Sequence, residues 1–188
     1  VGAYTTAQRT TNGTTLDISR PTYSTGDTLY LAYADDADAG SATFNGTWTT
    51  LVSDYTLAVS GTADSGSFYL LKCLAADAPA TITATSSVSE RAVMLAWIVQ
   101  GDGGLNVSVT SSSGTNSSPA VGDLTTTVND CLRFSIVADS TDRTPVGTFS
   151  GHTLLATQAY ASAGTISVQY KTITTAGTDT GVSTTQAS

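Results

Sequence analysis

Residues 92–99 read Ala-Val-Met-Leu-Ala-Trp-Ile-Val and form the longest uninterrupted apolar run in the chain. Successive side chains of a β-strand point to opposite faces, and in this run both faces are apolar. A strand with no polar side is typical of a position where both faces are covered by other parts of a protein. The run therefore predicts a central, buried strand over residues 91–99.

Two explanations for this double cover are open. A loop of the same chain could overlie one face, or that face could be a contact between subunits, because exposed apolar patches usually mark interfaces. The candidate interface residues are Ala92, Met94, Ala96 and Ile98. The opposite face carries Val93, Leu95, Trp97 and Val99.

The rest of the chain also has the texture of β-structure. Thr and Ser make up nearly a third of the 188 residues and alternate with apolar residues, which is the period-two pattern of half-buried strands. Turn signals separate runs of strand length, and no window shows a helical stripe. Strands are expected near residues 14–18, 27–34, 47–53, 67–74, 79–86, 91–99, 105–110, 123–128, 131–138, 152–160 and 164–173. The expected fold is an all-β, two-sheet antiparallel β-sandwich of jelly-roll-like form.

Two of these strands are expected to have one buried and one solvent-exposed face. The buried face would carry Leu132, Phe134 and Ile136 of one strand and Ile166, Val168 and Tyr170 of the other. The wet face would carry Cys131, Arg133, Ser135, Ser167, Gln169 and Lys171.

A single domain is expected over residues 1–188, because this length fits one large sandwich and no linker divides it. Its core would extend over about residues 14–175. Residues 1–13 and 177–188 are small, polar and rich in Thr, Gly and Ser. They are expected to be arms that become ordered only on contact with a partner.

The charge balance argues against some partners. Lys and Arg number 7 against 15 Asp and Glu, and the formal net charge of -8 opposes binding to nucleic acid or to anionic membranes. The longest apolar run is too short for a membrane helix, and the first residues lack the order of a signal peptide, so a soluble protein is expected. Charged residues make up only 12 % of the chain, so hydroxyl groups must solvate a surface that tolerates dense packing against other protein.

Side chains that commonly carry catalysis are scarce. The chain has one His, His152, and one Glu, and it has no Gly-x-Ser-x-Gly or phosphate-loop motif. A lone imidazole without an orienting partner favours a structural residue, so no enzyme activity is expected. Cys73 and Cys131 suit either a disulfide or two buried thiols, and free thiols are expected.

Asp35, Asp36 and Asp38 cluster in one predicted loop. Their oxygens could bind calcium if backbone carbonyls completed the shell. The spacing lacks the Asp-x-Asp-x-Asp-Gly pattern of calcium loops, so a solvated acidic loop with no cofactor is favoured.

Aromatic residues could either stack on sugars or fill the core. The six candidates are Tyr23, Tyr30, Tyr33, Trp48, Tyr55 and Trp97. Most of them fall at strand positions, which favours the core, while Tyr23 and Tyr55 lie nearer to loops.

The order of several segments resembles a known kind of domain. Gly26-Asp27 precedes Leu29-Tyr30-Leu31-Ala32-Tyr33, and then come Gly46-Thr47-Trp48-Thr49-Thr50-Leu51 and Ser67-Phe68-Tyr69-Leu70-Leu71-Lys72. The order continues with Ala80-Thr81-Ile82-Thr83-Ala84, the strand through Trp97, and Thr125-Thr126-Thr127-Val128-Asn129-Asp130-Cys131-Leu132. Over roughly residues 25–175, the chain resembles β-sandwich domains of bacteriophage virion-surface and tail-associated proteins.

This resemblance implies a non-enzymatic virion protein, most directly a head decoration or cement protein on the capsid surface. Its partners would be the major capsid protein and copies of itself, expected as a trimer. The alternative is a receptor- or carbohydrate-binding module of a tail fibre or tail tip, with a host glycan as ligand. The resemblance lies in strand and turn signatures and assigns no catalytic residue.

Overall fold

The computed structural model is built from β-strands and describes residues 1–36, 40–57, 66–101, 104–106, 109–110, 118–139, 146–160 and 164–185. The described residues form no helix. The strands are β1 (Tyr4–Ser19), β2 (Thr28–Asp35), β3 (Ala42–Phe44), β4 (Thr49–Leu57), β5 (Gly66–Leu74), β6 (Thr81–Val99), β7 (Ala120–Val121), β8 (Leu124–Thr126), β9 (Cys131–Asp139), β10 (Thr153–Tyr160), β11 (Gly164–Ile173), β12 (Gly177–Asp179) and β13 (Val182–Ser183). Their pairings are antiparallel, so the expected all-β antiparallel sandwich is confirmed.

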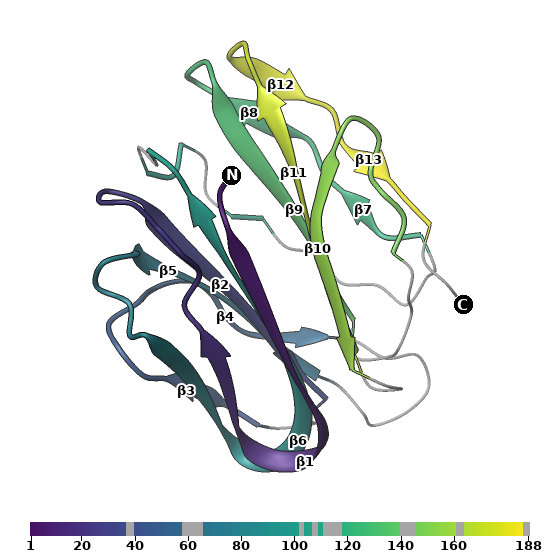
Figure 1. Cartoon of the computed structure of the whole chain (residues 1–188). Coiled ribbons are helices and arrows are strands. Elements are labelled where there is room, and N and C mark those ends of the chain that lie inside the picture. The colour runs from purple at the N-terminus through teal and green to yellow at the C-terminus, as the bar shows by residue number, and fades with distance from the viewer. Residues whose placement is uncertain are drawn as a thin grey trace.

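Two main sheets pack against each other (Figure 1). The central sheet has the order β1-β6-β2-β5-β4, and β3 also pairs with β6. The second sheet has the order β10-β11-β9. Two short ladders, β12 with β8 and β13 with β7, complete the fold.

β1 and β6 form a long ribbon that bends back on itself (Figure 1). Its halves pair separately, residues 4–9 with 92–97 and residues 15–19 with 81–85. Register shifts on both sides of Gly13 separate the halves, and such bulges bend a strand locally. Thr5 Oγ1 donates a hydrogen bond to the carbonyl oxygen of Ser19 at 2.6 Å, so the two ends of β1 meet. The sequence predicted two strands, 79–86 and 91–99, where the chain forms the single strand β6.

Both faces of residues 92–99 are covered by the chain itself. Val93, Leu95, Trp97 and Val99 lie between the two main sheets. Ala92, Met94, Ala96 and Ile98 pack in a second cluster with Leu16, Ile18 and Ile82 of the folded-over half of the ribbon. These four residues are at most 1 % exposed in a single copy, so they offer no surface to another subunit, contrary to the candidate interface.

The two segments predicted to be loose polar arms form strands instead. Residues 4–13 belong to β1, and residues 4–9 and 13 are held by main-chain pairing with β6, which needs no apolar burial of their own. Residues 177–179 and 182–183 form β12 and β13. Composition correctly identified these segments as poor in apolar side chains, but hydrogen-bonded ladders hold them in place.

Strand prediction failed where the strands are short. β3, β7, β12 and β13 were not expected. The described residues of the predicted strand 105–110, which are 105, 106, 109 and 110, form no strand.

Candidate functional site

The outer face of the second sheet is polar but buried. Arg133 and Ser135 of β9 are 5 % and 2 % exposed, and Ser167 and Gln169 of β11 are fully buried. The expectation that these residues form a wet face is therefore wrong. Residues 118–126, 146–152 and 177–185 cover this face, and we call them the roof.

The roof is held mainly by polar contacts. Its apolar part is a small cluster of Val137, Val146 and Phe149, with Val121 and Val182 half-buried against it. Gln169 supplies two hydrogen bonds from below, because its Oε1 accepts from Phe149 N at 2.8 Å and its Nε2 donates to the carbonyl of Gly147 at 2.9 Å.

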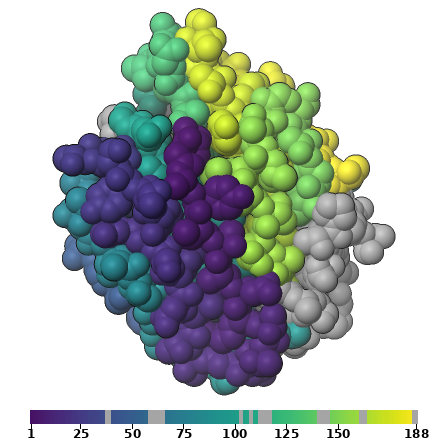
Figure 2. All heavy atoms as spheres, in the orientation of Figure 1, coloured from purple at the N-terminus to yellow at the C-terminus, as the bar shows by residue number. Residues whose placement is uncertain are grey.

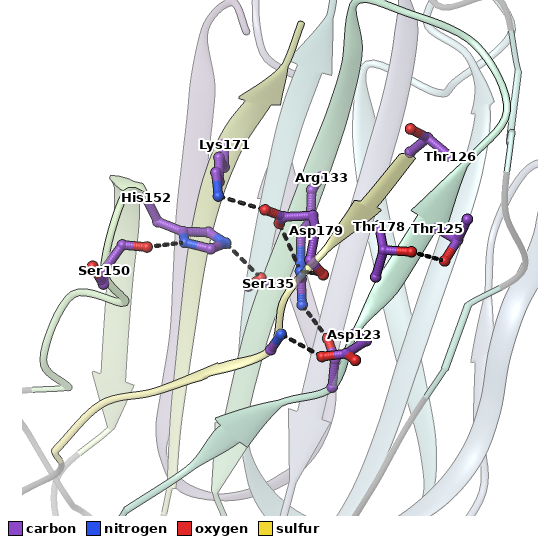
Figure 3. A network of polar contacts seen from close by, with 12 residues as sticks. Asp123, Thr125, Thr126, Arg133, Ser135, Ser150, His152, Lys171, Thr178 and Asp179 are labelled. Carbon is purple, nitrogen blue, oxygen red and sulfur yellow. Dashed lines mark hydrogen bonds and ion pairs between the residues drawn. The ribbon is translucent and has the colours of Figure 1, made fainter. Parts of the chain in front are cut away.

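An ion cluster joins β12 to the second sheet (Figure 3). Arg133 donates from Nη1 to Asp179 Oδ2 at 2.7 Å and from Nη2 to the carbonyl of Gly122 at 2.5 Å. Lys171 Nζ donates to Asp179 Oδ1 at 2.5 Å. Burial alone would raise the pKa of Asp179, but the hydrogen bonds from Lys171 and Arg133 outweigh it and the net pKa is lowered. The carboxylate therefore stays ionised between two cations.

His152 lies beside this cluster and binds Ser135 (Figure 3). Its Nδ1 is 3.1 Å from the carbonyl oxygen of Ser150, which can only accept, so Nδ1 carries the proton. Nε2, 3.0 Å from Ser135 Oγ, therefore accepts from that hydroxyl. Burial lowers the pKa of His152, which keeps the imidazole neutral. The pair has the polarity of a serine nucleophile and its base, but the base is oriented by a carbonyl and Ser135 is buried beneath the roof.

The carboxylates of Asp35 and Asp36, from the predicted acidic cluster, accept hydrogen bonds from different groups of the protein. Asp35 is fully buried and accepts from Tyr33 Oη and Ser67 N, each at 3.0 Å. Asp36 accepts from the main-chain N, Nε and Nη2 of Arg91, each at 2.9 Å. Asp38 lies outside the described residues. Within the described ranges, no group of three His, Cys, Asp or Glu side chains is placed to hold a metal ion.

Both cysteines are free thiols, as expected, but they are only partly buried and not fully buried, and they lie in different sheets. Cys73 is on β5 and half-buried, and burial raises its pKa to about 11. Cys131 begins β9, where its Sγ donates to the carbonyl of Val128 at 3.3 Å. A thiol with a raised pKa is a poor nucleophile, so Cys73 fits a packing role.

The aromatic residues mainly fill the core. Tyr33 and Trp97 are fully buried and Tyr30 nearly so. The rings of Tyr30 and Trp97 stack at 5.5 Å. Tyr23 is 38 % exposed, but the guanidinium of Arg20 covers its ring at 4.6 Å from the centroid. Core packing is thus confirmed for Tyr30, Tyr33 and Trp97.

Many exposed polar residues without charge lie on the two halves of the bent ribbon. Both halves turn their apolar residues toward the same core cluster, so their exposed residues face opposite sides of it. The exposed residues are Thr6, Gln8, Thr10, Thr11, Asn12, Thr14, Thr15 and Ser19 of β1 and Thr81, Thr85, Ser87 and Ser89 of β6. Asp17 is the one exposed charged residue of β1, and its carboxylate accepts from Thr83 Oγ1 at 2.6 Å. We call these exposed residues the hydroxyl ribbon. In Figure 2, β1 covers the lower part of the visible face.

The hydroxyl ribbon was missed because half of it was expected to be a loose arm. The sequence offered little signal, because residues 4–9 carry polar side chains at both odd and even positions and show no apolar alternation.

Comparisons with known proteins found no matching protein-family model, no matching curated protein and no matching solved structure. Among the described residues, no helix is long and apolar enough to cross a membrane.

Proposed function

We propose that this chain is a non-enzymatic structural protein of a bacteriophage virion, which decorates the head and stabilises it by protein–protein contacts. Its partners are the major capsid protein and other copies of the chain, arranged as a trimer on the capsid surface. The observation that carries the proposal is the hydroxyl ribbon, a long series of exposed and mostly uncharged polar side chains on one strand pair. The resemblance of residues 25–175 to virion-surface domains suggests the kind of assembly.

The chemistry of the hydroxyl ribbon suits adhesion to another protein. Burying an ion is expensive unless it is paired, whereas a hydroxyl needs only one hydrogen-bond partner. Thr is stiff at χ1, and Thr and Ser lose less rotamer freedom on burial than Lys or Glu. Main-chain pairing with β6 already fixes the backbone of β1, so little ordering remains to oppose binding.

Binding of this kind stabilises a capsid by mass action. A protein that binds the assembled shell and not its free subunits shifts the equilibrium toward the shell. Contacts made by several linked copies raise the apparent affinity without any new type of contact. A modest interface per copy is therefore sufficient for this role.

Gold-labelled antibodies against the chain, applied to virions of the phage that encodes it, test the proposal by electron microscopy. We expect label distributed over the heads. Label confined to tail tips contradicts head decoration and favours the receptor- or glycan-binding alternative. Virions without label contradict a virion role altogether.

A further inference from the structure

Residues 177–185 are held in the roof as a peptide is held by a strand-accepting protein. Residues 177–179 pair with β8 and residues 182–183 with β7. Thr184 N donates to the carbonyl of Pro119 at 3.0 Å, and Gly147 N donates to the carbonyl of Thr185 at 2.7 Å. Main-chain pairing of this kind supplies affinity in β-augmentation, and side-chain contacts supply specificity.

Two positions of the segment are recognised specifically. Asp179 lies between Arg133 and Lys171, and it brings a carboxylate to two cations of the second sheet. Gly181 donates its N–H to Asp123 Oδ1 at 2.7 Å, and a Cβ at this position would lie 2.4 Å from the carbonyl oxygen of Val121. We call the surface that holds residues 177–185, formed by β7, β8, Arg133 and Lys171, the seat. The seat requires an acidic residue and, two residues later, a glycine.

We propose that this seat is a strand-acceptor site for an extended Gly-Thr-Asp-Thr-Gly-Val segment, and that in assemblies of the protein it is filled by residues 177–182 of a second copy. The resident segment can leave without disturbing the main sheets, because only residues 174–176 join it to β11 and its apolar contact is the half-buried Val182. Departure leaves Arg133 with the carbonyl of Gly122 but without a carboxylate, and it leaves the edges of β7 and β8 without partners.

An identical segment restores every one of these contacts, and this makes a second copy the favoured occupant. The charges agree, because the segment brings Asp179 to the cations of the seat. The proposal goes beyond head decoration and does not rest on it, since exchange between copies requires no capsid.

Disulfide trapping in the full-length chain tests the exchange. Thr125 and Thr178 are paired directly across β8 and β12, and their Oγ1 atoms are 2.9 Å apart (Figure 3). In a background with Cys73→Ala and Cys131→Ala, a Thr125→Cys chain and a Thr178→Cys chain are mixed and oxidised, both after joint refolding and after concentrated incubation. A chain with both new cysteines shows that the pair can close, and a mixture of Thr178→Cys with Thr50→Cys, an exposed strand position, measures random cross-linking.

We expect the matched mixture to yield at least tenfold more covalent heterodimer than the Thr50→Cys mixture. An excess of a synthetic peptide of residues 174–185 should suppress the heterodimer, and the same peptide with Asp179→Asn should be at least tenfold less effective. Heterodimer at the random level while the double-cysteine chain closes internally overturns the proposal. Failure of the double-cysteine chain to close also overturns it, because the register of the seat is then wrong. Each result concerns purified protein and leaves the labelling of virions as a separate test.

Discussion

The buried ion cluster shows how single residues hold the roof in place. Arg133 lies on the buried outer face of β9. Without the Asp179 carboxylate, its guanidinium would keep only main-chain carbonyl partners. Lys171 differs because about a third of its side chain is exposed and water can replace its partner. The same carboxylate thus makes one strongly coupled contact and one weakly coupled contact.

Asp179→Ala should therefore destabilise the protein far more than Lys171→Ala. Breaking a buried pair and leaving one charge behind costs about 3 kcal/mol, whereas losing a partly exposed pair costs below about 1 kcal/mol. Urea unfolding at pH 7 followed by circular dichroism measures both. Equal losses for the two variants would show that Arg133 does not depend on Asp179.

The pH dependence of stability should follow His152 near neutrality. Burial lowers its folded pKa, so the unfolded chain, with an ordinary pKa of about 6.5, binds the proton more readily and stability falls as the pH drops below that value. Asp179 has a lowered pKa too, and its contribution is lost only below about pH 4. Between pH 7.5 and 5.5, the free energy of unfolding should decrease less in His152→Asn than in the wild type. The same decrease in both proteins would exclude His152 as the titrating group.

At the scale of elements, close backbone contact fixes the segment between β12 and β13. Gly181→Ala should loosen this segment, because its Cβ would meet the carbonyl of Val121, and overpacking of this kind costs about 2 kcal/mol. Gly122→Ala is the matched control, since a Cβ there meets nothing within 4 Å. Hydrogen exchange of the β12 and β13 amides should accelerate in Gly181→Ala alone. Acceleration in both variants, or in neither, contradicts the close fit.

The sequence predicted the elements that carry their own pattern and missed those that depend on a neighbour. The apolar runs of β2, β5, β6, β9 and β11 were identified because the spacing of their apolar residues indicates burial on one or both faces. β12 and β13 have almost no apolar content, and only the edges of β8 and β7 make them strands. The wet face predicted around Arg133 failed for the same reason, because alternation shows that a face is polar but not that a roof covers it.

The candidate site was predictable only in its chemistry. Low charge and abundant hydroxyls indicated a surface for packing against protein, yet the residues chosen as an interface, including Met94 and Ile98, are buried by the bent ribbon. The bent ribbon pairs residues 62 to 93 positions apart, and the Asn12-Gly13 turn signal does not show which distant strand β1 pairs with.

For the whole molecule, the central claim about the fold is that one copy covers its own core. Leu95 is fully buried, whereas Leu154 is 45 % exposed. Leu95→Ala should cost about 3 kcal/mol and Leu154→Ala below about 1 kcal/mol. Both losses should be independent of protein concentration in urea unfolding. A loss for Leu95→Ala that grows on dilution would mean that another subunit completes the core.

The central claim about function is that the hydroxyl ribbon binds the capsid. Thr6→Glu with Thr15→Glu places one charge in each half of the ribbon, and Thr50→Glu with Thr56→Glu places the same charges on exposed positions of β4. Circular dichroism should show that both variants keep the β-rich fold, because all four side chains are exposed.

The most direct test is the occupancy of purified, undecorated capsids by each variant, measured by co-sedimentation over a range of protein concentrations. We predict that the ribbon variant needs at least tenfold more protein than the wild type to reach half occupancy, because a carboxylate buried at the contact would lose its hydration without gaining a partner. The β4 variant should match the wild type. A ribbon variant that decorates capsids as well as the wild type would contradict the account.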